Sequence, residues 1–172
     1  MVNVAAIALF ATAVLGTARR DVAETLENLQ AIDTATNELT STITAWDGST
    51  VGAIGIASSA NALGDQIDAA NDDASDEEVA SSADSATVIS YITETGEPDI
   101  ATSLNALVSR EADFESAGVA SVVLSTLESL KNKTDTYGAT LYSITSTDQQ
   151  AAAQAAIDQL DADFAAAITA FS

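Results

Sequence analysis

The run DVAETLENLQAIDTATNELTSTITAW, residues 21–46, decides the fold. Its larger apolar residues recur at steps of three or four, which places them on one face of an α-helix because the helix has about 3.6 residues per turn. The stripe comprises Val22, Leu26, Leu29, Ile32, Thr36, Leu39, Ile43 and Trp46. The spacing therefore predicts a long amphipathic helix that ends at Asp47-Gly48.

The same spacing recurs through the rest of the chain. Apolar stripes at helical spacing cover residues 53–74, 88–92, 100–114, 119–144 and 153–171. We expect the third helix to close before Gly96, the fourth to carry Pro98 in its first turn, and Gly118 to end it. No stretch alternates like a strand. The predicted fold is all-α, a single domain built as an antiparallel bundle of five to six amphipathic helices.

The N-terminus has the features of a secretory signal peptide. The apolar run from Val4 to Leu15 is shorter than the roughly 20 residues that a helix needs to span a bilayer. The small residues Gly16-Thr17-Ala18 follow it, and Arg19-Arg20 adds a dibasic step. An amphipathic first helix is the alternative, but residues 4–15 offer no polar face. We predict a signal peptide with a dibasic trimming site at residues 1–20, a domain at residues 21–172, and no transmembrane segment in the mature chain.

The net charge of the chain limits the kinds of partner that it can bind. The chain carries 26 acidic residues against five Lys and Arg, which gives a formal net charge of −21. Nucleic acid and anionic membranes are therefore excluded as expected partners, because both require a basic surface. Cysteine is absent, so a secreted domain of this kind must be stabilised by packing rather than by disulfides.

Residues suited to catalysis or metal binding are scarce. Histidine and cysteine are both absent, and no Ser-x-x-Lys spacing offers a lysine base. The acidic segment Asn71–Asp84 fails the calcium-loop pattern, because Asp76 occupies the glycine position and Ser82 the glutamate position. We therefore predict a non-enzymatic protein with no catalytic residue, no metal and no cofactor.

Asn132-Lys133-Thr134 is an N-x-T sequon. In a secreted chain it makes Asn132 a candidate N-glycosylation site, provided that the side chain faces solvent. The alternative is an unused acceptor, because a folded helix hinders glycan transfer.

Three segments carry a resemblance to a known family. They are AIDTATNELTSTITAWDG (residues 31–48), DFESAGVASVVLSTLESLKNKTD (113–135) and AIDQLDADFAAAITAFS (156–172). Together they resemble the fungal hydrophobic surface-binding protein A family, also described as cell-wall galactomannoproteins. The most specific parts are the run from Gly118 to Lys131, the Asp163-Phe164 pair and the closing Ala170-Phe171. The resemblance implies a small, helical, non-enzymatic protein that is secreted, extracellular or cell-wall associated.

Two functions follow from the resemblance. The first is binding of a fatty acid or other lipid in an apolar slot between helices, and the second is adsorption to hydrophobic surfaces such as cuticle, wax or polyester, with recruitment of a secreted hydrolase. The helical stripes alone favour a dry core, and the resemblance shifts the expectation towards a slot. From the stripes we expect the lipid to contact Leu39, Ile43, Trp46, Leu63, Ile67, Leu107, Val123, Leu127, Ile157, Leu160 and Phe164. Trp46 ends the first stripe, where its ring could close a cavity or enter an interface.

Overall fold

The structure is a computed structural model that describes residues 14–172, with side chains described from Val22 onward. The predicted signal sequence, residues 1–20, therefore lies mainly outside the described residues. Its final part, from Val14, forms the beginning of the first helix. The proposed trimming site remains a prediction.

Helices make up almost all of the described chain, and these residues form no strand. In chain order the elements are α1 (Val14–Ala45), α2 (Thr50–Ser75), α3 (Ser82–Tyr91), the π-helical turn η2 (Ile92–Gly96), α4 (Glu97–Val108), α5 (Glu111–Ser116), α6 (Ala120–Ile144) and α7 (Gln150–Ala170). Since α3, η2 and α4 are continuous, the described residues form six helical rods. The predicted all-α bundle is confirmed.

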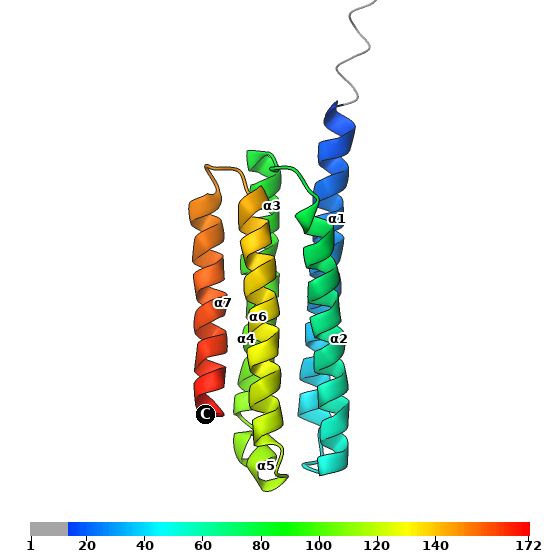
Figure 1. Cartoon of the computed structure of the whole chain (residues 1–172), viewed down its shortest axis with the longest axis vertical. Helices are drawn as coiled ribbons and strands as arrows, with labels where there is room; N and C mark the ends of the chain where they lie inside the picture. The colour runs from blue at the N-terminus through cyan, green and yellow to red at the C-terminus, as the bar shows by residue number, and fades with distance from the viewer. Residues whose placement is uncertain (1–13) are drawn as a thin grey trace, which may run out of the picture.

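The long rods lie side by side along a common axis, and each long rod runs opposite to the long rod before it in the chain (Figure 1). Their main contacts form a closed ring, in which α1 packs on α2, α2 on α6, α6 on α7, α7 on α4, and α4 on α1. The short helix α5 lies at one end of the bundle, beside the beginning of α6 (Figure 1). A ring of five helices turns five apolar stripes towards one axis, so the side chains on those stripes decide whether the axis is filled.

The predicted break before Gly96 is wrong, because the chain stays helical from Ser82 to Val108. At η2 the helix widens by one residue, and the N–H of Glu97 donates to the carbonyl of Ile92. Pro98 lies at the start of α4, where it has no N–H to donate. The wider turn accommodates the proline, and packing of this rod against α1 and α7 keeps its two parts in line.

The fourth predicted helix ends earlier than expected. α4 stops at Val108 and the chain turns through Ser109 and Arg110 before α5 begins. Phe114, expected on the same stripe, instead lies on α5 with none of its side chain exposed. Gly118 does end a helix, with a φ of +72° that favours glycine, but the helix is α5.

The first stripe faces the inside of the ring as predicted. Its residues from Leu29 to Trp46 are buried, and Thr36 fits among them because its hydroxyl donates to the carbonyl of Ile32 at 2.9 Å. Among the described residues, no helix combines the length and the apolarity needed to cross a bilayer.

Candidate functional site: an apolar slot inside the helix ring

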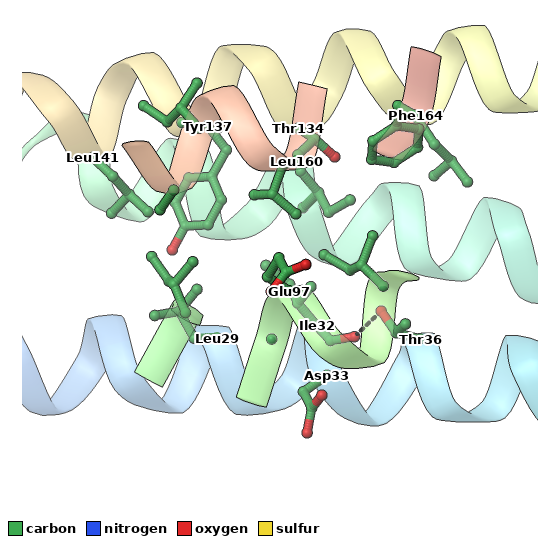
Figure 2. Close-up of a pocket in the computed structure, with 18 of the residues that line it drawn as sticks. Leu29, Ile32, Asp33, Thr36, Glu97, Thr134, Tyr137, Leu141, Leu160 and Phe164 are labelled. Atoms are coloured by element: carbon green, nitrogen blue, oxygen red, sulfur yellow. Dashed lines mark hydrogen bonds between the residues drawn. The ribbon is translucent and has the colours of Figure 1, made fainter. Parts of the chain in front are cut away.

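A cavity of about 110 Å³ lies on the axis of the ring. α1, α2, α4, α6 and α7 all contribute to its wall, and so do α3 and η2. Figure 2 shows aliphatic and aromatic side chains, among them Leu29, Leu160 and Phe164, converging from several helices on this space. We call this cavity the central slot.

Small residues on α7 explain why the slot is open. Ala153 and Ala156 face it, and their methyl groups are too short to fill the axis, whereas leucine side chains would extend into it. Gly138 of α6 has a different role, because a Cβ there would lie 3.4 Å from Ile157, so the glycine lets α7 pack closely on α6. Native cores normally pack to the density of organic crystals. In this protein the alanines of α7 are too short to fill the axis of the ring, so space remains there.

Two hydroxyl groups in the slot have no hydrogen-bond partner among the described residues. They belong to Tyr137 and Ser103, whose side chains are 6% and 4% exposed. Tyr137 points from α6 across the ring towards Leu29 (Figure 2). Burial, and to a lesser degree the charges of Glu77 and Asp73, raises the pKa of Tyr137, which keeps its hydroxyl neutral and able to donate. A buried hydroxyl without a partner is costly, so both groups could gain from a polar ligand atom.

Acidic groups stand around α4 at the wall of the slot, where Asp33 of α1 lies beside Asp99 and Glu97 lies beside Asp163 of α7. The pKa of Asp33 is raised from 3.8 to about 6, mainly by burial and also by the neighbouring Asp99 carboxyl, while a hydrogen bond from Tyr91 acts in the opposite direction. Figure 2 shows the Asp33 carboxyl pointing away from the apolar side chains. Burial also raises the pKa of Glu97. This side of the slot is a poor place for an anionic head group.

The Asp33 shift predicts a pH dependence of stability. The folded protein binds the proton of the Asp33 carboxyl more tightly than the unfolded chain does. Protonation of Asp33 therefore contributes to the free energy of unfolding, and this contribution is fully present below about pH 4 and is lost as the pH rises through about 6. In urea unfolding between about pH 4 and pH 7, wild type should lose more free energy of unfolding than Asp33→Asn. The exposed Asp65→Asn is the charge-matched control and should behave like wild type. Parallel curves for wild type and Asp33→Asn would contradict the prediction.

The three described basic side chains already form ion pairs with aspartates. Arg110 pairs with Asp113 at 3.0 Å, Lys131 lies 2.8 Å from Asp135 and 2.7 Å from Asp161, and Lys133 pairs with Asp68. None of the three lines the central slot. Within residues 22–172, an anionic ligand head therefore meets neutral hydroxyls rather than an unpaired ammonium or guanidinium group.

The structure brings most of the sequence-predicted residues together. Those that line the central slot are Leu39, Leu63, Ile67, Leu107, Leu127, Ile157, Leu160 and Phe164. Val123 lines a neighbouring cavity instead. Ile43 is completely buried but lines neither cavity.

Trp46 packs in an aromatic cluster at the α5 end of the bundle. Its ring stacks on Phe114 with centroids 4.3 Å apart, and the Arg110 guanidinium lies 4.9 Å from its centroid. The indole N–H donates to the carbonyl of Ser49 at 2.8 Å. Gly52 allows this position, since a Cβ there would lie 2.7 Å from the indole. Trp46 therefore packs at the α5 end of the bundle and lines neither apolar cavity, although its stacking partner Phe114 lines the cavity that contains Val123.

Sequence reasoning did not select Tyr137, Ser103, the slot residues of η2 or, apart from Leu107, those of α4. Tyr137 lies at a core position of the predicted helix over residues 119–144. This spacing could have predicted that its hydroxyl would be buried. Ser103 gave no such signal, because a serine beside an apolar stripe is common. Asn132 is exposed on α6, while Thr134 of the same sequon is half-buried and lines the slot.

Comparison with known proteins now identifies the family. The model of the family described as hydrophobic surface binding protein A matches residues 22–143. The crystal structure of AfMP4p in complex with palmitic acid is 34% identical, with a TM-score of 0.84 over 88% of this chain and 99% of that one.

More distant structures share the fold. Ligand binding domain 1 of Penicillium marneffei MP1 protein, complexed with arachidonic acids, is 16% identical with a TM-score of 0.84 over 88% of this chain and 99% of that one. Domain 2 of the same protein, complexed with multiple arachidonic acids, is 15% identical with a TM-score of 0.83 over 88% and 96%. No curated protein sequence matches significantly. From the family match and the 34% identical relative, the chain belongs to the hydrophobic surface binding protein A family.

Proposed function

We propose that this protein is a secreted, non-enzymatic binder of fatty acids or similar lipids, with the acyl chain held in the central slot. The observation that carries the proposal is the slot itself, an apolar space on the axis of a closed helix ring that contains two unpartnered hydroxyls. The palmitic acid in the complex of the 34% identical relative supports the same ligand class.

The energetics are sufficient for micromolar binding. Each buried methylene contributes about 0.8 kcal/mol, so ten contribute roughly 8 kcal/mol, the free energy of a micromolar complex. The entropy lost when the acyl chain is ordered opposes this gain, and burial of further methylenes offsets that loss. The slot of about 110 Å³ is smaller than typical ligand pockets of about 300–1,000 Å³, so the helices must separate when a long chain enters.

The hydroxyls of Tyr137 and Ser103 are the proposed partners of the polar end of the lipid. Both donate without carrying charge, and both are buried in the slot. A carboxyl group that accepts from either hydroxyl gives it the hydrogen-bond partner that the described side chains do not supply. The neutral donors also fit a protein whose described cations are paired elsewhere.

Titration of delipidated protein with palmitic acid tests the proposal. We expect saturable binding with a Kd in the micromolar range, because the slot is a defined site of limited capacity. The absence of saturable binding at tens of micromolar by a protein of normal helicity would overturn it. Adsorption of the same protein to a hydrophobic resin should be measured in parallel.

Adsorption to hydrophobic surfaces is the second candidate function, and the family description favours it. Val51, Ile54 and Val122 are large apolar residues with 77%, 68% and 54% of their surface exposed. All three lie near the starts of α2 and α6, at the same end of the bundle (Figure 1). Resin adsorption that persists when the slot is filled with palmitic acid would assign adsorption to this outer surface, where a secreted hydrolase could be recruited.

Secretion with trimming is proposed from the N-terminal sequence. The family is one of secreted fungal surface proteins, and residues 1–20 carry the apolar run and the dibasic step. Intact-mass analysis of protein from the host's medium should show a chain that starts at Arg19 or Asp21. A retained Met1 would contradict this proposal. The same spectrum would show whether the exposed Asn132 carries a glycan.

A further inference from the structure

A second apolar cavity lies beside the central slot, between the first halves of α2 and α6. Its volume is about 260 Å³, larger than that of the slot. Alanines of α2, including Ala53, Ala57 and Ala60, form one wall, and Phe114 of α5 lies at the closed end of the bundle. Again short side chains leave space between helices that could otherwise pack fully. We call this space the lateral cavity.

The two cavities share a wall. Leu39, Leu107, Leu127 and Leu130 line both of them. Along α6 the lateral cavity extends from Val122 to Leu130 and the slot from Leu127 to Tyr142, so the two overlap by about one helical turn. Each residue that lines both spaces is a leucine, and a leucine can change rotamer without breaking any hydrogen bond.

The lateral cavity has no group that would hold a polar ligand atom. No ionisable side chain lines it, and its two hydroxyls are already used. Thr50 donates to the carbonyl of Ala117 at 3.2 Å, and Thr126 donates to the carbonyl of Val122 at 2.8 Å. The central slot, in contrast, contains the unpartnered hydroxyls of Tyr137 and Ser103. The difference in polarity gives an amphiphilic ligand one orientation.

We propose that the lateral cavity receives the methyl-terminal part of a long acyl chain whose polar end lies in the central slot, so that the two cavities act as one bent acyl channel. This inference rests on the proposed function. The chain passes between Leu39, Leu107 and Leu127, which part to admit it. Ile54 and Val122 are both exposed and line the lateral cavity, so this end of the channel opens to the surface.

Chain-length dependence tests the inference. Ala57 is half-buried in the lateral cavity, and Ala57→Phe fills that space without reaching the slot residues on α7. We expect Ala57→Phe to bind stearic acid at least about tenfold more weakly than wild type and lauric acid within about twofold, because only the longer acid has methylenes to lose. Ala62→Phe, at an exposed position of the same helix, is the matched control and should leave both affinities unchanged.

The outcomes separate this inference from the proposed function. Wild type that binds neither acid contradicts the proposed function itself. Wild type that binds both acids, with Ala57→Phe weakening them equally or not at all, overturns the bent channel and leaves the slot in place. Should Ala57→Phe lose helicity, Ala53→Phe fills the same cavity from the neighbouring turn and the same comparison decides.

Discussion

Replacing Ala156 with phenylalanine is expected to abolish measurable binding of palmitic acid, with an affinity at least about a hundredfold below that of wild type. Ala156 is 7% exposed and faces the central slot from α7, so the ring of the new side chain occupies the space that the acyl chain needs. Excluding four or more methylenes at about 0.8 kcal/mol each removes more than the 2.7 kcal/mol that a hundredfold change requires. Titration of delipidated protein measures the effect.

The neighbouring Ala155→Phe is the matched control. Ala155 is exposed on the same helix, so the same substitution there adds the ring to the surface and should leave the affinity within about twofold of wild type. Circular dichroism must show normal helicity for both variants, because overpacking a core costs about 1–3 kcal/mol. Undiminished palmitic acid binding by a folded Ala156→Phe protein would place the ligand outside the slot.

Phe114→Ala is expected to lower the free energy of unfolding by about 3–5 kcal/mol, the largest loss of stability that we expect from one substitution. The Phe114 ring is fully buried, stacks on Trp46 and meets Phe171 edge-on with centroids 5.9 Å apart. Its removal leaves a cavity that two aromatic rings and the Arg110 guanidinium cannot fill without moving. Urea unfolding of the apo protein measures the loss.

Phe114→Leu separates cavity formation from the loss of aromatic contacts. Leucine keeps most of the apolar volume, so it should cost much less than alanine, near the 1.5 kcal/mol limit of tolerated core exchanges. A loss below about 1.5 kcal/mol for Phe114→Ala would show that α5 and the aromatic cluster do not close the bundle as described.

Most of the fold could be predicted from the sequence. The stripes of α1, α2, α6 and α7 are regular enough that periodicity fixes both the helices and their buried faces. The break expected at Gly96 and Pro98 did not form, because local signals for a helix end were weaker than the packing of the whole rod against α1 and α7. The π-helical turn is the local adjustment that this packing requires.

The site was only partly predictable. Periodicity identifies which residues face the axis, and eight of the eleven chosen residues line the central slot. It cannot say how far apart the helices stand, because the width of the slot depends on the closure of a ring whose neighbours are distant in sequence. Trp46 illustrates the limit. Its partners Phe114 and Arg110 lie on or next to α5, and their contacts with its ring turn it towards the end of the bundle.

A crystal structure of this protein with palmitic acid is the most direct measurement of the central claim. We expect continuous density for the acyl chain on the axis of the helix ring, in contact with Leu63, Leu127 and Leu160, and with its polar end within hydrogen-bonding distance of Tyr137 or Ser103. Density confined to the outer surface near Val51, Ile54 and Val122, with the slot closed and empty, would contradict the account.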